Sequence, residues 1–316
     1  MPPFPKPQFA YDYNANAQIQ ALRQHKQVRA IPAKSAGTLL LATWNIANFG
    51  VQQRRDKDRQ LIAEILSWFD IVAIQEVNVN WTHLLDIQHG QLEDKFRLLV
   101  SDAAGNNERM AFLYDAVKVK PLEMVGEISF PPAEYDKVKL PGISRKFDGF
   151  DRNPYFATFE AGKFSFTLAN AHLFYGSEKK QDVERRALET FAVARWADRE
   201  AKSSYCFTRD IIALGDFNMP KAQPGDPIYK ALTAKGLELP GHSTQMGSSI
   251  ASDSQYDQIA FFPGETKNDF TGQKGVFDFD ATLFADLWQQ SQSQFKTFTK
   301  YYISDHRPMW AEFRIV

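Results

Sequence analysis

Carboxylates, amides and imidazoles stand at the ends of apolar segments in this chain. Residues 211–214 are aliphatic, yet they lead at once into Asp216 and Asn218 within the sequence "IIALGDFN". A carboxylate in an apolar strand costs several kcal/mol unless it is paired or bound to a metal ion. Asp216 and Asn218 therefore either shape a turn or belong to a site built at the carboxyl end of the strand.

The same pattern recurs in six apolar segments. Each polar residue taken alone has an ordinary structural explanation, such as a turn or a half-buried imidazole that has found a partner. Six such segments make independent structural explanations much less convincing, and we expect the side chains to converge on one pocket. The residues are Asn45, Gln75, Glu76, Asn170, His172, Asp216, Asn218, Asp257, Ser304, Asp305 and His306.

The chemistry of these groups favours hydrolysis of a phosphate ester. Carboxylate and amide oxygens suit Mg²⁺, and also Mn²⁺ or Ca²⁺, whereas a structural zinc site usually includes thiolates. Histidines beside carboxylates serve as bases or acids. A divalent cation can neutralise phosphate oxygens while a base activates water and an acid protonates the leaving oxygen.

The elements that must position these groups alternate along the chain. Strands are expected at 38–50, 70–77 and 155–173, among about ten in total, together with three or four helices that include 54–69 and 177–202. Strands that are apolar throughout indicate sheets covered on both faces. The sequence therefore predicts one α/β domain over residues 38–316, with two stacked sheets and helices outside. Residues 1–37 are predicted to form an N-terminal arm or surface extension.

Composition limits the classes of partner. The formal net charge is −1, with 37 basic and 38 acidic residues among 316. Proteins that bind nucleic acid through many phosphate contacts are usually more basic, so any polyanion site here must be local or charged by a metal. The single cysteine excludes an intramolecular disulfide and favours a cytoplasmic location, with export left open if a leader has been removed. No apolar run reaches the ~18 residues of a membrane span, and we expect a monomer.

Eight segments resemble, in order, the motifs of the endonuclease/exonuclease/phosphatase superfamily. They are most similar to its deoxyribonuclease I branch, and the resemblance covers residues 38–316. It implies a four-layer α/β/β/α sandwich and cleavage of P–O bonds that depends on a divalent metal. The segments are "TWNIANFG", "DIVAIQEV", "ERMAFLYD", "DRNPYFATF", "NAHLFYG", "LGDFN", "YDQIAFF" and "ISDHRPMWAEF".

The resemblance assigns the metal and phosphate contacts as follows. Glu76 would be the main ligand of Mg²⁺, and Asn45 beside it would touch the metal or the phosphate. Asp305 would be a second carboxylate of the metal site or its network. Arg152 resembles the phosphate-binding arginine of the superfamily, against the plain alternative of a surface charge. Whether one or two metal ions act stays open.

The catalytic roles follow from the same motifs. His306 would be the general base, oriented by Asp257, and His172 would be the general acid or a phosphate contact, oriented by Glu108. Asp216 would position the attacking water, and Asn218 would help to bind the scissile phosphate. The two pairs resemble the deoxyribonuclease I arrangement.

Some residues depart from that branch. Asn78 and Asn106 stand where it has an arginine and a tyrosine that contact the minor groove, which puts binding of double-stranded DNA in doubt. Its disulfides are absent. After His172 the chain continues with residues that could stack on a base and meet phosphates, or that could equally form a solvated helix start with core aromatics. They are Phe174, Tyr175, Lys179, Lys180, Arg185 and Arg186.

The leading functional hypothesis is a metal-dependent endonuclease that hydrolyses phosphodiester bonds of DNA, single-stranded or structured. The alternative is a phosphoesterase of the same fold that acts on a phospholipid, an inositol phosphate or another small phosphoester. A third possibility, a binding module without catalysis, predicts erosion of the catalytic set, and that set is complete in this sequence.

Overall fold

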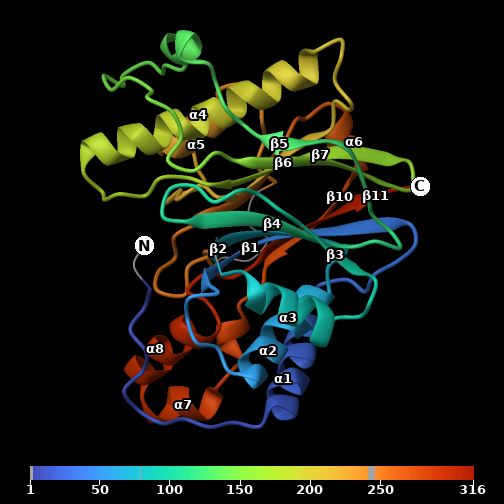
Figure 1. The fold of residues 1–316 in the computed structure, drawn as a ribbon, viewed down its shortest axis with the longest axis vertical. Helices are drawn as coiled ribbons and strands as arrows, with labels where there is room; N and C mark the ends of the chain where they lie inside the picture. The colour runs from blue at the N-terminus through green and yellow to red at the C-terminus, as the bar shows by residue number, and fades with distance from the viewer. Residues whose placement is uncertain (1–2, 79, 241–245) are drawn as a thin grey trace.

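Two packed β-sheets form the centre of the molecule in the computed structural model, which describes residues 3–78, 80–240 and 246–316 (Figure 1). Both sheets are mixed, since β1 runs parallel to β2 and β7 runs parallel to β8. The first sheet has the order β10 (Phe270–Val276), β11 (Met309–Arg314), β1 (Thr38–Phe49), β2 (Ile71–Asn78), β4 (Glu108–Asp115) and β3 (Phe96–Val100). The second has the order β5 (Lys120–Glu127), β6 (Tyr155–Ala161), β7 (Phe164–His172), β8 (Ile211–Asp216) and β9 (Asp257–Phe261).

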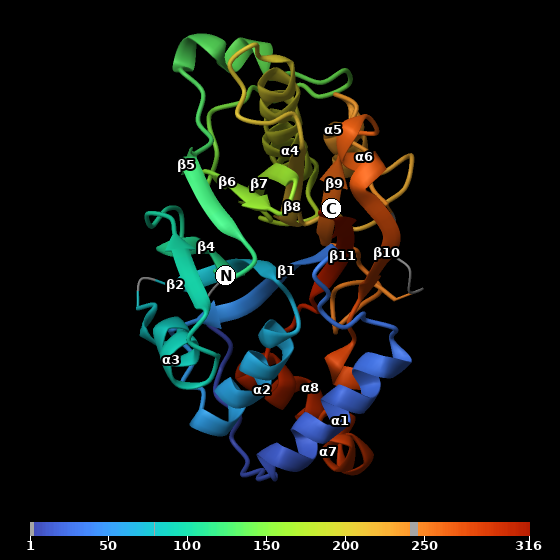
Figure 2. The same cartoon turned by 90° about the vertical axis from the view of Figure 1, so that its right-hand side faces the viewer.

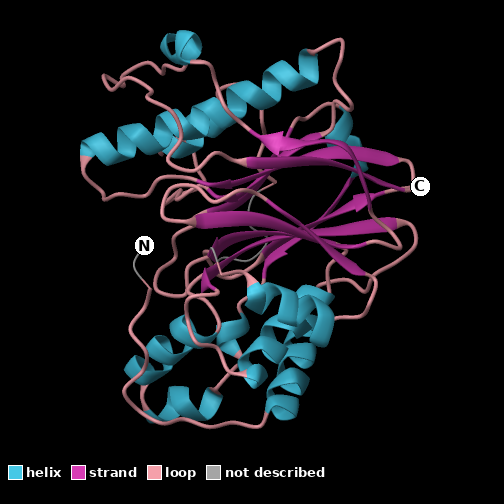
Figure 3. Ribbon diagram, in the orientation of Figure 1, coloured by secondary structure: helices cyan, strands magenta, loops and turns pink. Residues whose placement is uncertain are grey.

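Helices cover the outer face of each sheet, which completes the predicted α/β/β/α sandwich (Figure 3). The first sheet is covered by α1 (Ala15–Val28), α2 (Asp56–Ser67), α3 (Thr82–Gly90), α7 (Ala285–Gln290) and α8 (Gln292–Tyr302). The second is covered by α4 (Lys180–Lys202) and α5 (Pro227–Thr233). The short α6 (Glu265–Asp269) leads into β10, and 3₁₀ turns lie at Pro132–Lys137 and Phe279–Ala281. In the part of the chain that is described, no helix is long and apolar enough to cross a bilayer.

The apolar strands are explained by burial on both faces. Along β1, Leu39 and Leu41 pack into the cluster between the two sheets. Leu40 and Ala42 point the other way and pack against the helices. Successive side chains of a strand alternate between its faces, so a strand that is covered twice must be apolar at every position.

Several elements lie outside the sequence prediction. The helices α3, α7 and α8 and the strand β10 were not expected. The strand β10 reads "FTGQKGV", and as an edge strand with two glycines it lacks the apolar pattern of a central strand.

The N-terminal 37 residues contribute a helix that packs on the first sheet's helical layer (Figure 2). Asn14 caps α1 by accepting a hydrogen bond from the backbone of Ala17. Leu22 is fully buried in the same hydrophobic cluster as α2 and α8. Arg29, directly after α1, pairs at 2.5 Å with Asp278, which follows strand β10 of the first sheet.

The topology gathers the polar strand ends at one edge of the sandwich. In the first sheet, Asn45 is aligned with Gln75, the residue before Glu76. In the second, Asp216 on β8 is aligned with His172 on one side and Asp257 on the other. Parallel β1 and β2, and parallel β7 and β8, therefore present their carboxyl ends to the same region.

Candidate active site

Close approach of β7 and β8 brings His172 and Asp216 together. Gly215 adopts a φ of +129°, and a Cβ atom at this position would lie 2.0 Å from the carbonyl oxygen of Ala171. Only glycine fits such a contact without a shift of the backbone. Gly215 of "LGDFN" is therefore needed to position the carboxylate of Asp216, which follows it.

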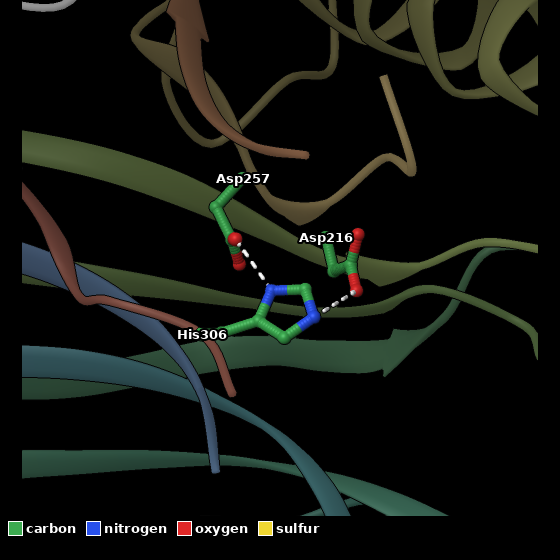
Figure 4. Close-up of side chains that lie close together, drawn as sticks. All are labelled: Asp216, Asp257 and His306. Carbon is green, nitrogen blue, oxygen red and sulfur yellow. Dashed lines mark hydrogen bonds and ion pairs between the residues drawn. The ribbon is translucent and has the colours of Figure 1, made fainter. Parts of the chain in front are cut away.

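His306 is held between two buried carboxylates (Figure 4). Its Nδ1 atom lies 2.7 Å from Oδ2 of Asp257, and its Nε2 atom lies 3.7 Å from Oδ2 of Asp216. Burial by itself lowers the pKa of His306, but Asp257 and Asp216 outweigh that effect and raise the pKa well above its usual value. The predicted pairing of His306 with Asp257 is present in the structure.

His172 forms a second pair of the same kind. Its Nδ1 atom lies 2.9 Å from Oε2 of Glu108, and its Nε2 atom lies 3.8 Å from Oδ2 of Asp216. Burial raises the pKa of Glu108, but the neighbouring His172 and Arg152 outweigh it and lower the pKa to about 2. The Nε2 atoms of both histidines thus approach the same oxygen of Asp216.

Glu76 reaches the pocket because its strand is irregular. The register of β2 against β4 shifts between Ile74 and Val77, and Glu76 has a φ of +59°. A bulge with a left-handed residue re-aims a side chain at a cost of the order of 1–3 kcal/mol, and such strain clusters at functional sites. The carboxylate accepts hydrogen bonds from the Asn48 backbone at 2.8 Å and from Asn45 Nδ2 at 3.1 Å.

Asn45 links the two sheets at the floor of the site. Its Nδ2 atom donates to Oε1 of Glu76 and, at 3.0 Å, to Oδ2 of Asp216. Behind it, Gln75 donates to Oδ1 of Asn170 at 2.6 Å. Asn170 in turn donates to the carbonyl oxygens of Ile74 and Ala111. These polar contacts fix the relative position of the strand ends.

The donor set fits a hard divalent cation. Oδ1 of Asn45 is buried and has no hydrogen-bond partner within the protein. Burial raises the pKa of Asp305, and the negative charge of Glu76 raises it further. A carbonyl-type oxygen without a partner beside carboxylates that repel each other is an environment that a cation would relieve.

Asp216, Asp257 and His306 also have the composition of a metal site. Among the described residues, ligand atoms of Asp216, Asp257 and His306 all lie within 4.8 Å of one another. The Nδ1 atom of His306 is engaged with Asp257 at hydrogen-bond distance, which leaves Nε2 as its nitrogen facing Asp216. The hydrogen bond favours a histidine–aspartate pair over direct coordination at Nδ1.

Asn218 both shapes the turn after β8 and lines the pocket. Its backbone N–H donates to Oδ1 of Asp216 at 2.8 Å, which is the contact of an Asx-turn. Its side chain lines the pocket and donates to the carbonyl oxygen of Leu173 at 2.9 Å. Asp216 and Asn218 therefore shape the turn and also face the site.

Arg152 occupies the edge of the pocket with its nitrogens directed at protein acceptors. It donates to the carbonyl oxygens of His172 and Leu173 at 2.9 and 3.0 Å, and its Nη1 atom lies 3.1 Å from Asp151. It lies 3.7 Å from Glu108 and is 4% exposed. These contacts hold the strand end that carries His172. A contact of Arg152 with phosphate stays a prediction.

A cavity of about 610 Å³ adjoins Glu76, His172 and Asp216, whereas Asn45, Asp257 and His306 are not part of its lining. Sequence reasoning did not single out Asn107, Asp151 and Gly176 as part of it. The cavity is lined by Glu76, Asn106, Asn107, Asp151, Arg152, His172, Phe174, Tyr175, Gly176, Asp216 and Asn218.

Sequence reasoning also missed Glu189, which lies on α4 and is fully buried. Its carboxylate accepts hydrogen bonds from the backbone N–H groups of Asp151 and Phe174 at 3.2 and 3.1 Å. Burial raises the pKa of Glu189 to about 7. A carboxylate in the otherwise apolar run "ALETFAVA" was the signal that could have identified it.

One protein resembles this chain in sequence over most of its length. No model of a known protein family matches the chain. The chain is 28% identical over 296 residues to a protein of Thioalkalivibrio sp. (strain K90mix) described as "Deoxyribonuclease", and the match covers 90% of this chain and 73% of that protein.

Solved structures share the fold at low sequence identity. D. rerio TDP2 complexed with a single strand DNA product has a TM-score of 0.56 at 16% identity, covering 87% of this chain and 98% of that one. An endonuclease/exonuclease/phosphatase family protein from Bacteroides thetaiotaomicron has a TM-score of 0.55 at 16% identity, with coverages of 88% and 95%. The predicted resemblance and the predicted sandwich are confirmed: the chain has the fold of the endonuclease/exonuclease/phosphatase proteins and resembles a deoxyribonuclease in sequence.

Proposed function

We propose that the protein is a divalent-metal-dependent phosphodiesterase that hydrolyses DNA. The observation that carries the proposal is the placement of two histidine–carboxylate pairs on either side of Asp216. The Nε2 atoms of His306 and His172 lie 3.7 and 3.8 Å from the same Asp216 oxygen. One pair can take a proton from water while the other gives a proton to the leaving oxygen.

His306 is the proposed general base. A general base requires the neutral imidazole, in which Nδ1–H would donate to Asp257 and Nε2 would carry the lone pair that faces Asp216. Asp216 is in position to orient a water molecule for His306. His172 has the matching arrangement with Glu108 and is the proposed acid or phosphate contact.

Glu76, Asn45 and Asp305 are the proposed ligands of Mg²⁺. The cation would supply positive charge to the non-bridging oxygens of the phosphate. Mn²⁺ and Ca²⁺ have the same preference for oxygen ligands. The chain's own residues bind the phosphate, exclude bulk water and move the protons.

DNA is the proposed substrate because of the relative described as a deoxyribonuclease. Single-stranded or structured DNA is favoured over a regular duplex, since Asn78 and Asn106 replace the two groove-contacting residues of the deoxyribonuclease I branch. The structural neighbour in complex with a single strand DNA product is consistent with this choice.

A substrate panel tests the proposal. Plasmid DNA, single-stranded DNA, sphingomyelin, phosphoinositides and bis-p-nitrophenyl phosphate are incubated with the protein and Mg²⁺ or Mn²⁺, with and without a chelator. We expect cleavage of DNA that is lost with the chelator and reduced about 10²- to 10⁴-fold in His306→Ala. The matched control is His89→Ala, which removes an exposed histidine outside the pocket.

The panel also separates the alternatives. Detergent-dependent turnover of a lipid, with DNA left intact, would replace the DNA proposal by the phospholipid alternative. Equal activity of the wild type and His306→Ala on every substrate would reject the catalytic proposal as a whole.

A further inference from the structure

One wall of the pocket is aromatic and has no role in the proposed chemistry. Phe174 and Tyr175 follow β7 and line the cavity beside His172. Tyr256 precedes β9, and its ring lies 6.5 Å from that of Tyr175 and 5.9 Å from that of His306, measured between centroids. We call Phe174, Tyr175 and Tyr256 the aromatic wall.

The aromatic wall is not part of the protein core. Each of the three residues is only partly buried. Within the part of the chain that the structure describes, none of them belongs to the three hydrophobic clusters or to the partly buried residues packed against those clusters. Partly exposed aromatic rings that border a catalytic pocket are available to a ligand, whereas core aromatics are not.

Side chains of α4 hold Phe174 and Tyr175 in place. The guanidinium of Arg185 lies 4.1 Å from the centre of the Phe174 ring, and that of Arg186 lies 5.1 Å from the centre of the Tyr175 ring. The buried carboxylate of Glu189 accepts from the Phe174 backbone at 3.1 Å. Binding to a wall that is already ordered costs little conformational entropy.

The two arginines that contact the wall are paired with carboxylates. Arg185 pairs with Glu189 at 3.1 Å and with Asp151 at 3.3 Å. Arg186 pairs with Glu178 at 3.4 Å. These pairs leave the two guanidinium groups little free positive charge for a phosphate backbone. The rings offer a stronger source of affinity than the charges.

We propose that the aromatic wall is a stacking subsite for an unpaired nucleobase next to the scissile phosphate. A base that is paired within a duplex keeps its faces stacked on its neighbours, so the subsite selects single-stranded or frayed nucleic acid. Stacking on aromatic side chains tolerates every base, because each base has a π-face. This inference rests on the proposed phosphodiesterase function and names the form of its substrate.

The test uses the full chain and a fluorescent single-stranded oligonucleotide. Tyr175→Ala removes the ring and is expected to weaken binding of the oligonucleotide, and to raise KM, about 10-fold or more. Tyr175→Phe keeps the ring and is expected to stay within about 3-fold of the wild type. The control Tyr205→Ala removes a tyrosine that is 92% exposed and lies outside the pocket.

The ligand provides an independent control. Oligonucleotides in which one base is replaced by an abasic unit are scanned along the strand. At the stacking position, the wild type is expected to lose affinity about as strongly as Tyr175→Ala loses it on the intact strand. Tyr175→Ala itself should barely respond to the missing base, because the two deletions remove the same contact.

The outcomes separate this inference from the function on which it rests. Wild-type cleavage of DNA with equal affinities for wild type, Tyr175→Ala and the abasic strands would overturn the stacking subsite and leave the phosphodiesterase proposal standing. Failure of the wild type to bind any single-stranded oligonucleotide would also overturn it. Failure to hydrolyse even bis-p-nitrophenyl phosphate would reject the proposed function. Thermal melting of each variant shows whether a loss comes from misfolding.

Discussion

At the scale of single residues, the two histidine–carboxylate pairs have a shared centre in Asp216. Burial raises the pKa of Asp216, but His306 and His172 outweigh it, and the pKa is lowered. The lowered pKa favours the ionised carboxylate, which is the form that the proposed orientation of water requires. A single buried carboxylate flanked by two histidines makes the protonation states of all three groups depend on one another.

Glu108 provides a pH-dependent contribution to stability that can be measured. Its pKa in the folded protein is about 2, against an ordinary value of 4.5. The folded protein therefore gains stability from this carboxylate above about pH 4.5 and loses it as the pH falls toward 2. We expect the difference in unfolding free energy between the wild type and Glu108→Gln to shrink by about 1 kcal/mol per pH unit between about pH 4 and 2.5.

Urea unfolding at several pH values measures this difference. The control Glu93→Gln removes a carboxylate from a side chain that is 75% exposed, and its difference from the wild type should stay nearly constant. Parallel stability curves for the wild type and Glu108→Gln over this range would contradict the assigned interaction of Glu108 with His172.

At the scale of elements, the strands that the sequence predicts correctly are those covered on both faces of their sheet. Strands β1, β2 and β8 were predicted from the sequence because a strand covered on both faces requires a continuous apolar run. The helix α8 was missed because its buried face is aromatic and lies within the polar sequence "QSQFKTFTKYY", with Phe295, Phe298 and Tyr302 toward the core. Edge strand β10 was missed because an edge does not require that apolar pattern.

The candidate site was predictable only as far as its side chains stand at strand ends. His306 with Asp257, and His172 with Glu108, are brought together as expected. The left-handed conformation of Glu76 and the contacts that Glu189 makes to two loops follow from tertiary packing. No periodicity in the sequence encodes a bulge or a helix-to-loop hydrogen bond, so these features required the structure.

Helix α1 is expected to be an integral part of the domain. Leu22 has no exposed surface and packs in the cluster shared with α2 and α8. Truncation of a fully buried leucine leaves a cavity, so Leu22→Ala should lower the unfolding free energy by about 2–5 kcal/mol. Urea unfolding measures the loss, with Gln20→Ala on the exposed side of the helix as the control. A loss below about 1 kcal/mol would indicate that residues 1–37 are a dispensable extension.

At the scale of the whole molecule, the site lies where the two sheets meet. Asn45 and Glu76 come from the first sheet, whereas Asp216 and His172 come from the second. The Asn45 side chain already bridges the sheets by donating to Glu76 and Asp216. The negative charge of Glu76 raises the pKa of the proposed second carboxylate, Asp305, so a cation bound there would relieve a repulsion that exists only in the folded protein.

A cation that binds only the folded arrangement should therefore stabilise the entire sandwich. Binding to the native state adds RT ln(1 + [L]/Kd), which is about 2.7 kcal/mol when the free Mg²⁺ is 100 times its Kd. We expect the melting temperature of the wild type to rise with MgCl₂ at constant ionic strength, and the rise to be largely lost in Glu76→Gln.

Melting in the absence of substrate makes this measurement independent of activity. The control Glu123→Gln changes an exposed carboxylate on β5 and should keep the full response to Mg²⁺. Equal gains in wild type and Glu76→Gln would mean that the cation acts through general screening or at another site. Loss of the gain in Glu76→Gln but not in Glu123→Gln would show that Mg²⁺ stabilises the fold through the carboxylate of Glu76, at the bulge of β2. A ligand bound at one site raises the melting temperature of the whole protein only when it binds the folded state in preference to the unfolded chain.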